Sequence, residues 1–373
     1  MQVRPDININ TRFYRDAWLE INLDNLEDNL KTIHQQCRKP LILVLKADAY
    51  GHGAGVIANM LDSYEFVDSY AVANIDEALN LRQSTNKRIM VLGITPEWSY
   101  GVALEKDIEL TICDLASAEK LQKMAADMEK VAKVHLKIDT GMNRIGFKMD
   151  KPEEFKEIVR KIDILFNLKI QSIYSHYSNA EDHPTCATQT SKFINFTDDL
   201  SFPRHIASSR AARMINQDPF DFVRVGIELF GLDNPILKPV MSMYARVVFL
   251  KTIAPGEAVS YQSLWRTKRT TKIITLPLGY ADGIPRSLSG KIKGFCKENF
   301  HQQVGLITMD QMMMDIGDTE DVKVGDQVEL IGSHLPLREW SKAANMISYE
   351  LVTSMNLRLP KVYTRNAETA NQF

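Results

Sequence analysis

The sequence has little that would direct the chain to a membrane, a metal ion or a nucleic acid. No apolar run is long enough for a membrane-spanning helix, and the N-terminal segment MQVRPDININTRFYRDAW lacks the apolar core of a signal peptide. The four cysteines, Cys37, Cys113, Cys186 and Cys296, form no CxxC pair, which argues against zinc and against a disulfide framework. The net charge of -2 favours neither nucleic acid nor an anionic membrane. We therefore expect a cytoplasmic protein with no metal site, no nucleic-acid partner and no membrane partner.

The sequence does contain a regular series of short apolar runs, each as long as one buried strand. They lie at Leu41–Leu45, Ser69–Ala73, Ile89–Leu92, Leu110–Cys113, Ala132–Ile138, Leu168–Tyr174, Arg204–Ala207 and Phe222–Val225. Most segments between them have helical periodicity, as in DLASAEKLQKMAADMEK, which begins at Asp114. Alternating strands and helices predict an α/β fold with an N-terminal (β/α)8 TIM-like barrel, and a doubly wound open sheet is the rival.

The pattern changes after the eighth run. From Pro239 to Tyr363 the chain has β-rich runs such as TKIITLPLGY and DQVELIGS, separated by PGEA, ADG and VGD turns, with few convincing helices. We predict two domains, a barrel over residues 1–238 and a mainly β domain over residues 239–373.

A barrel fold suggests a functional role for the stretch LILVLKADAYGHG, in which an apolar strand ends at Lys46. Catalytic side chains of such barrels lie where the strands end. The polar residues at these ends are Lys46, Lys137, Asp139, His176, Ser208, Ser209 and Arg224. Apolar walls disfavour the ammonium form of a lysine, which makes it a better base and a better nucleophile towards an aldehyde. Lys46 is therefore a candidate Schiff-base lysine.

Pyridoxal phosphate (PLP), an aldehyde cofactor, also needs a phosphate site and a partner for its ring nitrogen. Gly226 permits close approach of the backbone, and Ser209 lies where the next helix is expected to begin. Arg224 is a candidate partner for the ring nitrogen. Because arginine keeps its proton, it would leave that nitrogen unprotonated and make the ring a weaker electron sink.

Seven motifs in order across nearly the whole chain resemble those of the alanine racemase family. They are VLKADAYGHG, KIDTGMNRIGF, VRVGIELFGL, VSYQ, LGYADGIPR, TMDQMMMDIG and ISYELVTSMNLRLPKVY. The resemblance implies a fold-type III PLP enzyme that works as a homodimer, with each active site completed by the partner's β domain. It also implies that the first 20 residues pack with the β domain, so that RDAWLEINL forms a strand outside the barrel.

The resemblance assigns roles to individual residues. Lys46 matches the lysine that binds the cofactor and acts as the base for the D-enantiomer, and Tyr261 matches the opposing base, which serves the L-enantiomer from the partner subunit. The other matches are with cofactor-binding residues (Tyr50, His176, Ser209, Arg224, Gly226, Ile227 and Tyr349), with substrate-binding residues (Arg144 and the backbone of Met309) and with supporting residues (Lys137, Tyr280 and Asp310). Lys137 matches a lysine that is often carbamylated in the family and then orients the arginine at position 144.

The leading hypothesis is an alanine racemase that supplies D-alanine for peptidoglycan. A racemase for larger amino acids on the same scaffold is the second hypothesis, although bulky Tyr349 and Tyr280 favour a small substrate. A non-catalytic PLP carrier is the third, and such a protein would need neither the β domain nor Tyr261. An aldolase or decarboxylase is disfavoured because those reactions need a stronger electron sink than the Arg224 position suggests.

Overall fold

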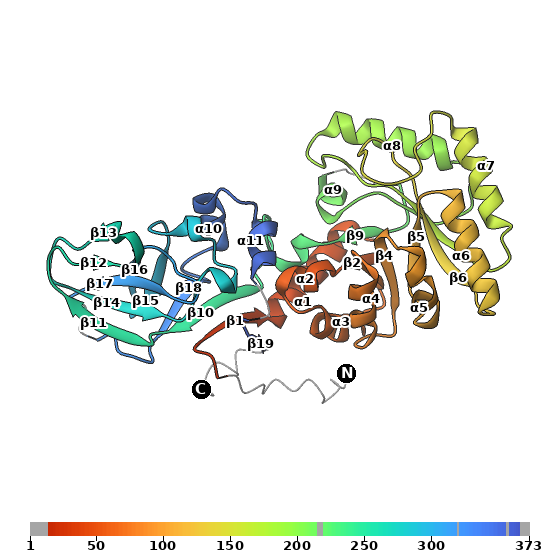
Figure 1. Ribbon diagram of the computed structural model, residues 1–373. Coiled ribbons are helices and arrows are strands. Elements are labelled where there is room, and N and C mark those ends of the chain that lie inside the picture. Colours follow the sequence, from red (N-terminus) through yellow and green to blue (C-terminus); the bar gives the residue numbers. More distant parts are fainter. Residues whose placement is uncertain (1–13, 215–218, 319–320, 356–357, 366–373) are drawn as a thin grey trace. The chain divides into compact units, whose positions relative to one another are not determined.

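The computed structural model of the protein describes residues 14–214, 219–318, 321–355 and 358–365 (Figure 1). Residues 1–13, which belong to the segment expected to pack with the β domain, lie outside the described residues. Among the described residues, every helix is too short or too polar to cross a bilayer.

The chain divides into two compact units, which we describe separately. The barrel unit comprises residues 30–49 and 53–229, and the β-rich unit comprises the remaining described residues, including 50–52.

The barrel unit contains a sheet of eight parallel strands, in the order β8-β7-β6-β5-β4-β3-β2-β9. The strands are β2 (Leu41–Val44), β3 (Val67–Val72), β4 (Arg88–Ile94), β5 (Glu109–Ile112), β6 (Ala132–Lys137), β7 (Leu168–Tyr174), β8 (Arg204–His205) and β9 (Val223–Val225). The eight apolar runs of the sequence correspond to these strands, with ends that differ by at most two residues. Consecutive strands are neighbours and the last pairs with the first, so the barrel is confirmed and the doubly wound alternative is wrong.

The two edge strands of this sheet, β8 and β9, come together next to the expected cofactor residues. Ser208 and Arg224 form an isolated parallel bridge, and the Arg224 amide donates to the Ala207 carbonyl at 3.1 Å. The barrel is therefore nearly closed. The carboxyl ends of its strands, which we call the barrel mouth, form the end where barrel enzymes place their chemistry.

Helices follow the strands and lie on the outside of the barrel (Figure 1). Their bounds are α2 (Lys46–Gly51), α3 (Ala54–Leu61), α4 (Ile75–Arg82), α5 (Tyr100–Glu105), α6 (Leu115–Asp127), α7 (Pro152–Asp163), α8 (His183–Thr197) and α9 (Ser209–Met214), with α1 (Leu23–Cys37) preceding β2. In α6 the buried residues are Ala118, Leu121 and Ala125, and Asp114 caps its first turn by accepting from the Ser117 amide at 2.7 Å. Such a cap contributes about 1 kcal/mol and fixes where the helix begins.

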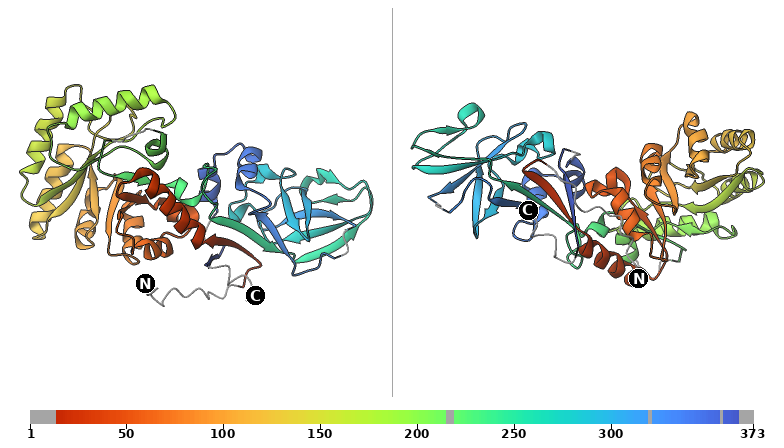
Figure 2. Two further views of the ribbon diagram at one scale, coloured as in Figure 1. Left: turned by 180° about the vertical axis from the view of Figure 1, so that it is seen from behind. Right: turned by 90° about the horizontal axis from the view of Figure 1, so that it is seen from below.

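The β-rich unit is built on a nine-stranded sheet, in the order β11-β14-β17-β16-β15-β18-β10-β1-β19, whose strands are visible from two further sides in Figure 2. The strands are β1 (Ala17–Asn22), β10 (Met241–Arg246), β11 (Phe249–Ile253), β14 (Thr271–Leu276), β15 (Lys293–Cys296), β16 (Asn299–Val304), β17 (Met312–Gly317), β18 (Gln327–Ile331) and β19 (Lys361–Thr364). β12 (Ala258–Val259) and β13 (Trp265–Arg266) form a separate two-stranded sheet. β1, from the RDAWLEINL segment, pairs antiparallel with β10 and parallel with β19.

This unit also contains two helices that we did not expect from the sequence, α10 (Leu337–Ala344) and α11 (Ser348–Ser354). Pro336 precedes α10 as its N-cap, and the buried residues of α10 include Leu337 and Trp340, three positions apart. This spacing places both side chains on one face of a helix. The prediction of a mainly β second domain with few helices is confirmed, and these two short helices are an addition to it.

Candidate active site

Lys46 follows β2 at the barrel mouth and begins an unusual turn. The four residues after it, Ala47 to Tyr50, have φ angles of 51° to 54°, and Gly51 has 81°. Helix α2 is therefore a left-handed turn, in which each non-glycine residue costs about 1–2 kcal/mol. Strain of this kind persists only where the surrounding structure enforces it, and such strain clusters at functional sites.

Several hydrogen bonds hold this strained turn in place. The Glu77 carboxylate accepts from the Ala47 amide at 2.9 Å and from the Ala73 amide at 2.8 Å. The Asp48 carboxylate accepts from the Ala54 amide at 2.8 Å. The turn that begins directly after Lys46 is thus held by Glu77 and by its own Asp48 side chain.

A second lysine, Lys137, ends β6 and leads into the loop that carries Arg144. The loop folds back on itself, because the Phe147 amide donates to the Lys137 carbonyl at 2.7 Å. Asp139 stabilises the turn by accepting from the amides of Gly141 at 2.8 Å and Asn143 at 3.1 Å. The Lys137 side chain is buried, with Nζ 5.3 Å from the ring centroid of Tyr174.

Arg224 in β9 is buried beneath the barrel mouth and donates to a dense set of acceptors. Its Nη2 donates to the carbonyls of Ser175 at 2.7 Å and Ile206 at 2.9 Å, and to His176 Nδ1 at 2.9 Å. Its Nη1 donates to His205 Nδ1. The guanidinium is therefore fixed by its neighbours, and His176 must carry its proton on Nε2 because Nδ1 accepts.

The expected phosphate-binding residues of the barrel unit lie at the carboxyl ends of adjacent strands. Ser209 is buried and begins α9, and Gly226 and Ile227 directly follow β9. The bridge between Ser208 and Arg224 brings the two ends together. In many barrel enzymes a phosphate is bound by the loops after the last two strands and a short helix.

The charges of this cluster shift its pKa values in a consistent direction. Burial and Arg144 lower the pKa of Lys46, while Glu77 opposes this effect. Burial, Arg144 and Arg224 lower the pKa of Lys137 to about 8. Burial and then Arg224, together with the other cations, hold the pKa of His176 well below its usual value. The mouth is therefore rich in positive charge, which suits an anionic cofactor and substrate, and His176 is neutral.

The remaining expected residues lie in the β-rich unit, in two groups. Tyr50 and Tyr349 from α11 form one group, with ring centroids 6.1 Å apart in an edge-to-face arrangement. Tyr50 is buried and also contacts Phe230 at 5.7 Å.

The second group surrounds Tyr261, which is 71% exposed and opens a short turn with positive φ at Ser260 (67°) and Gln262 (62°). Tyr261 and Tyr280 line a pocket of about 480 Å³ together with Gln262, Arg286, Ile307 and Thr308.

Met309 and Asp310 come directly after Thr308, which lines this pocket, and contacts with neighbouring residues hold both in place. The Met309 carbonyl accepts from the Ala281 amide at 3.0 Å, and Asp310 forms an ion pair with Arg358 at 2.6 Å. Gly279 allows this close approach, because a Cβ there would lie 2.3 Å from the Met309 carbonyl oxygen. Arg358 also lies 3.4 Å from the buried Asp282, so that one guanidinium contacts both Asp310 and Asp282.

Some residues of the barrel mouth were not predicted from the sequence. Tyr174 lies 5.4 Å from the Arg224 guanidinium carbon and stacks on His205 at 5.0 Å. Both occur inside runs that read as ordinary strands. The sequence feature that could have identified this pair is His205 in the run RHIA, because a buried polar side chain needs a hydrogen-bond partner.

Two family models cover most of the chain. The alanine racemase N-terminal domain matches residues 21–234, and the alanine racemase C-terminal domain matches residues 240–363. The chain belongs to the alanine racemase family. Among curated proteins it is 38% identical to alanine racemase of Clostridium novyi, over 95% of this chain and 97% of the relative. The chain is thereby assigned to a family of isomerases that act on amino acids.

Solved structures agree with this assignment. Alanine racemase of Clostridium difficile has a TM-score of 0.89 at 32% identity, covering 95% of this chain and 97% of that one. A Bartonella henselae alanine racemase structure with covalently bound pyridoxal phosphate has a TM-score of 0.84 at 30% identity, covering 94% and 99%. Histidine racemase from Leuconostoc mesenteroides has a TM-score of 0.86 at 27% identity, covering 95% and 99%. The same fold therefore includes racemases named for more than one amino acid.

Proposed function

We propose that the protein interconverts L-alanine and D-alanine with PLP, in a two-base mechanism that uses Lys46 and the partner subunit's Tyr261. The observation that carries this proposal is Lys46 itself, an amine with a lowered pKa at the end of a barrel strand and at the start of a strained turn. The relatives named alanine racemase support the choice of reaction.

The residues of the barrel mouth fit the chemistry of PLP. Lys46 supplies an amine for the aldehyde. Ser209 and Gly226, which follow the bridged residues Ser208 and Arg224, offer a buried hydroxyl and a backbone without a side chain for the phosphate. Tyr50, Ile227 and Tyr349 are the other proposed contacts of the cofactor. When bound, PLP withdraws electrons from the Cα of an attached amino acid and makes its hydrogen acidic.

Arg224 is the proposed partner of the ring nitrogen. Its guanidinium is held by two carbonyls and two histidines, and it stays protonated. An arginine donates a hydrogen bond to this nitrogen without transferring a proton. Arg224 would thereby favour proton exchange over reactions that need a longer-lived carbanion.

Two bases on opposite faces account for racemisation, because one removes the α-proton and the other returns a proton to the opposite side. We propose that Lys46 Nζ serves the D-enantiomer and Tyr261 Oη the L-enantiomer. His176 Nδ1 accepts from Arg224, so its Nε2–H is oriented as a donor. That donor would stabilise a tyrosine oxygen that has lost its proton.

The exposure of Tyr261 favours a homodimer in which this residue acts in the partner's site. The substrate carboxylate would then bind Arg144 and the Met309 amide, near Tyr280 and Asp310. We further propose that Lys137 carries a carbamate that orients Arg144. Support for this modification comes from its pKa of about 8, since only the neutral amine reacts with carbon dioxide.

The experiment that tests the proposed function is racemisation in deuterated water. The purified protein is incubated with PLP and L-alanine, and both D-alanine and deuterium at Cα are measured. Appearance of D-alanine with deuterium at Cα is the expected result. Bound cofactor without exchange on any amino acid would contradict the proposal and favour a carrier.

A racemase of another amino acid, or of several, is the second candidate, and the histidine racemase with the same fold favours including it. The same assay with L-histidine, L-serine and L-lysine separates the two candidates. A kcat/KM for alanine at least tenfold above the others supports the first. If alanine is the preferred substrate, we propose that the protein supplies D-alanine for peptidoglycan.

A further inference from the structure

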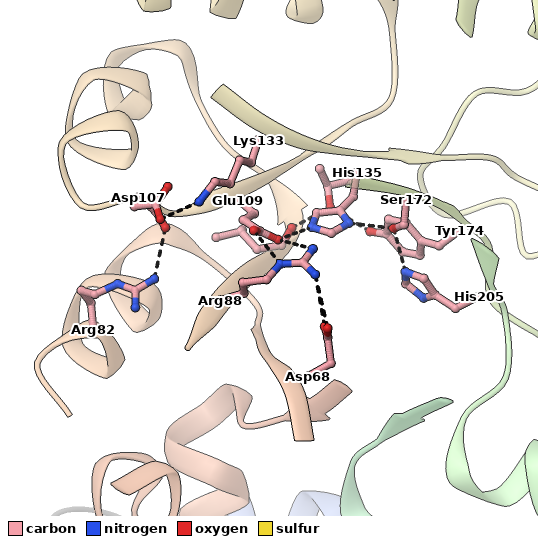
Figure 3. Close-up of polar contacts among 12 residues, drawn as sticks. Asp68, Arg82, Arg88, Asp107, Glu109, Lys133, His135, Ser172, Tyr174 and His205 are labelled. Carbon is pink, nitrogen blue, oxygen red and sulfur yellow. Dashed lines mark hydrogen bonds and ion pairs between the residues drawn. The ribbon is translucent and has the colours of Figure 1, made fainter. Parts of the chain in front are cut away.

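A line of polar side chains runs across neighbouring strands of the barrel unit, from Arg88 and Glu109 through His135 and Ser172 to His205 (Figure 3). Arg88 and Glu109 are the first residues of β4 and β5, His135 lies within β6, and Ser172 lies within β7. The line continues through His205 to Arg224. Glu109, His135, Ser172, His205 and Arg224 are each at most 4% exposed. Burying five polar groups is unfavourable unless every one is hydrogen-bonded.

The contacts along the line are short and continuous. His135 Nε2 lies 2.8 Å from the Glu109 carboxylate, and His135 Nδ1 lies 2.7 Å from Ser172 Oγ. Ser172 Oγ lies 3.0 Å from His205 Nε2, and Arg224 Nη1 donates to His205 Nδ1. No protein contact along this line is longer than an ordinary hydrogen bond.

The donor at one end determines the direction of every bond. A guanidinium only donates, so His205 Nδ1 accepts and His205 carries its proton on Nε2. His205 Nε2 then donates to Ser172 Oγ, and the Ser172 hydroxyl donates to His135 Nδ1. His135 in turn carries its proton on Nε2 and donates to Glu109. His205, Ser172 and His135 then each donate one bond and accept one along the line, with Arg224 as the donor at one end and Glu109 as the acceptor at the other.

The far end is anchored by an ion pair. Arg88 donates to both oxygens of Glu109, at 2.9 and 3.0 Å, and approaches Asp68 at 3.3 Å. Although burial opposes ionisation, His135 and Arg88 lower the pKa of Glu109 to about 2. The line therefore begins at a permanently charged acceptor.

Aromatic rings fix the orientation of His205. Tyr174 stacks on it at 5.0 Å with an interplanar angle of 8°, and Phe222 meets it edge-on at 6.1 Å. Rotation of the imidazole out of the line would disrupt both contacts.

We propose that Glu109, His135, Ser172 and His205 form a one-directional hydrogen-bonded chain that presents His205 Nδ1 as an acceptor and thereby positions the Arg224 guanidinium. These four are positioning residues, since they act on the reaction only through Arg224. The inference rests on the proposed function for its effect on activity, but the protonation pattern is a property of the protein alone.

The first test uses the apoprotein labelled with ¹⁵N at histidine, so it does not depend on activity. Resonances of His135 and His205 are assigned by their loss in His135→Gln and His205→Gln. The expected result is a neutral ring protonated on Nε2 for both residues. A proton on Nδ1 of His205, or a cationic His205, would overturn the proposal.

The second test interrupts the chain with Ser172→Ala, and Thr197→Val is the matched control. Thr197 is likewise buried and loses one hydroxyl, but it lies on α8 and bonds to the Phe193 carbonyl at 2.7 Å, outside the chain. Ser172→Ala should lower kcat about 5- to 10-fold with KM for alanine unchanged, the effect of one lost hydrogen bond, and should mix the His205 tautomers. Thr197→Val should change neither.

The outcomes separate the two proposals. Equal kcat for Ser172→Ala and Thr197→Val, with an unaltered His205 tautomer, would refute the chain. If the wild-type protein racemises no amino acid but shows the expected tautomers and their mixing in Ser172→Ala, then the chain stands and the proposed function fails.

Discussion

The candidate residues of the barrel unit and those of the β-rich unit differ in their surroundings. Lys137 and Arg224 are 5% and 4% exposed and lie among other charges. Tyr261, Tyr280 and Met309 are 71%, 43% and 53% exposed. The barrel thus places most of its candidate groups in buried, charged surroundings, with Arg144 as an exposed exception, whereas the β-rich unit buries Tyr50 but leaves Tyr261, Tyr280 and Met309 on a surface.

This difference suggests a division of labour within the proposed mechanism. A lysine acts as a base near neutral pH when burial and nearby cations disfavour its ammonium form, and the barrel supplies both for Lys46. An exposed tyrosine acquires such surroundings only when another surface covers it. The comparison therefore predicts that substitutions in the barrel and in the β-rich unit have different kinetic signatures.

The largest effect is expected for Lys46→Ala. Loss of the only amine proposed to hold PLP and to move the α-proton should lower kcat on the order of 10³-fold or more in both directions. It should also abolish the absorption of PLP bound covalently to the protein. Lys133→Ala is the control, because Lys133 forms a surface pair with Asp107 at 2.7 Å. Retention of a covalent cofactor in Lys46→Ala would show that another amine is used.

Tyr261→Phe should produce a large effect in one direction only. Removal of a general base lowers the rate by about 10²–10⁴-fold. We expect that loss for α-proton removal from L-alanine, while exchange from D-alanine in deuterated water persists in part because Lys46 remains. Equal losses from both enantiomers would contradict the two-base assignment and the proposed role of the β-rich unit.

The barrel was predictable from the sequence because its strands are buried on both faces. Such strands read as continuous apolar runs, and helices separate them at regular intervals. Leu41–Val44, for example, is buried at all four positions. The two short helices α10 and α11 were missed because one or two turns give a weak periodic signal among strands.

Local strain and polar pairing in the mouth were not predictable. The left-handed turn at Ala47 to Tyr50 contains no glycine, and its conformation is stabilised by Glu77 from outside the turn and by the Asp48 side chain within it. His135 and Glu109 begin or interrupt runs that look like ordinary strands, and only the register of β5 with β6 brings them together. The strand-end argument named some residues with assigned roles, such as Lys46 and Arg224, and the family motifs supplied the others, such as Tyr261 and Arg144.

A smaller effect, on stability, tests the charge of Lys137. As a bare amine its pKa falls from 10.5 to about 8 on folding, so the folded state binds fewer protons between these values. The resulting destabilisation is fully present below about pH 8 and disappears as the pH rises towards 10.5. Lys137→Met should then raise the free energy of unfolding at pH 7 by about 1–3 kcal/mol.

Carbamylation reverses the sign of this prediction. A carbamate among Arg144 and Arg224 would be stabilising, so Lys137→Met in bicarbonate buffer should lower the Tm and raise KM for alanine. Thermal unfolding of both proteins at pH 7 and pH 9, with and without bicarbonate, makes the distinction. An identical Tm difference in all four conditions would contradict both charge states.

The smallest effect is expected for Tyr280→Phe. Tyr280 lines the pocket beside Tyr261, but it is 43% exposed and its amide already bonds to the Thr308 carbonyl at 3.0 Å. Loss of a hydroxyl in such a solvated place should raise KM for alanine about 2- to 5-fold with kcat unchanged, because a solvated hydrogen bond has a small net value. Steady-state kinetics in both directions measure this, with Tyr244→Phe, on β10, as the matched control. A kcat loss as large as that of Tyr261→Phe would mean that Tyr280 takes part in proton transfer. The exposed fraction of a side chain in the single chain would then fail to distinguish the substrate-binding residues of the β-rich unit from its catalytic base.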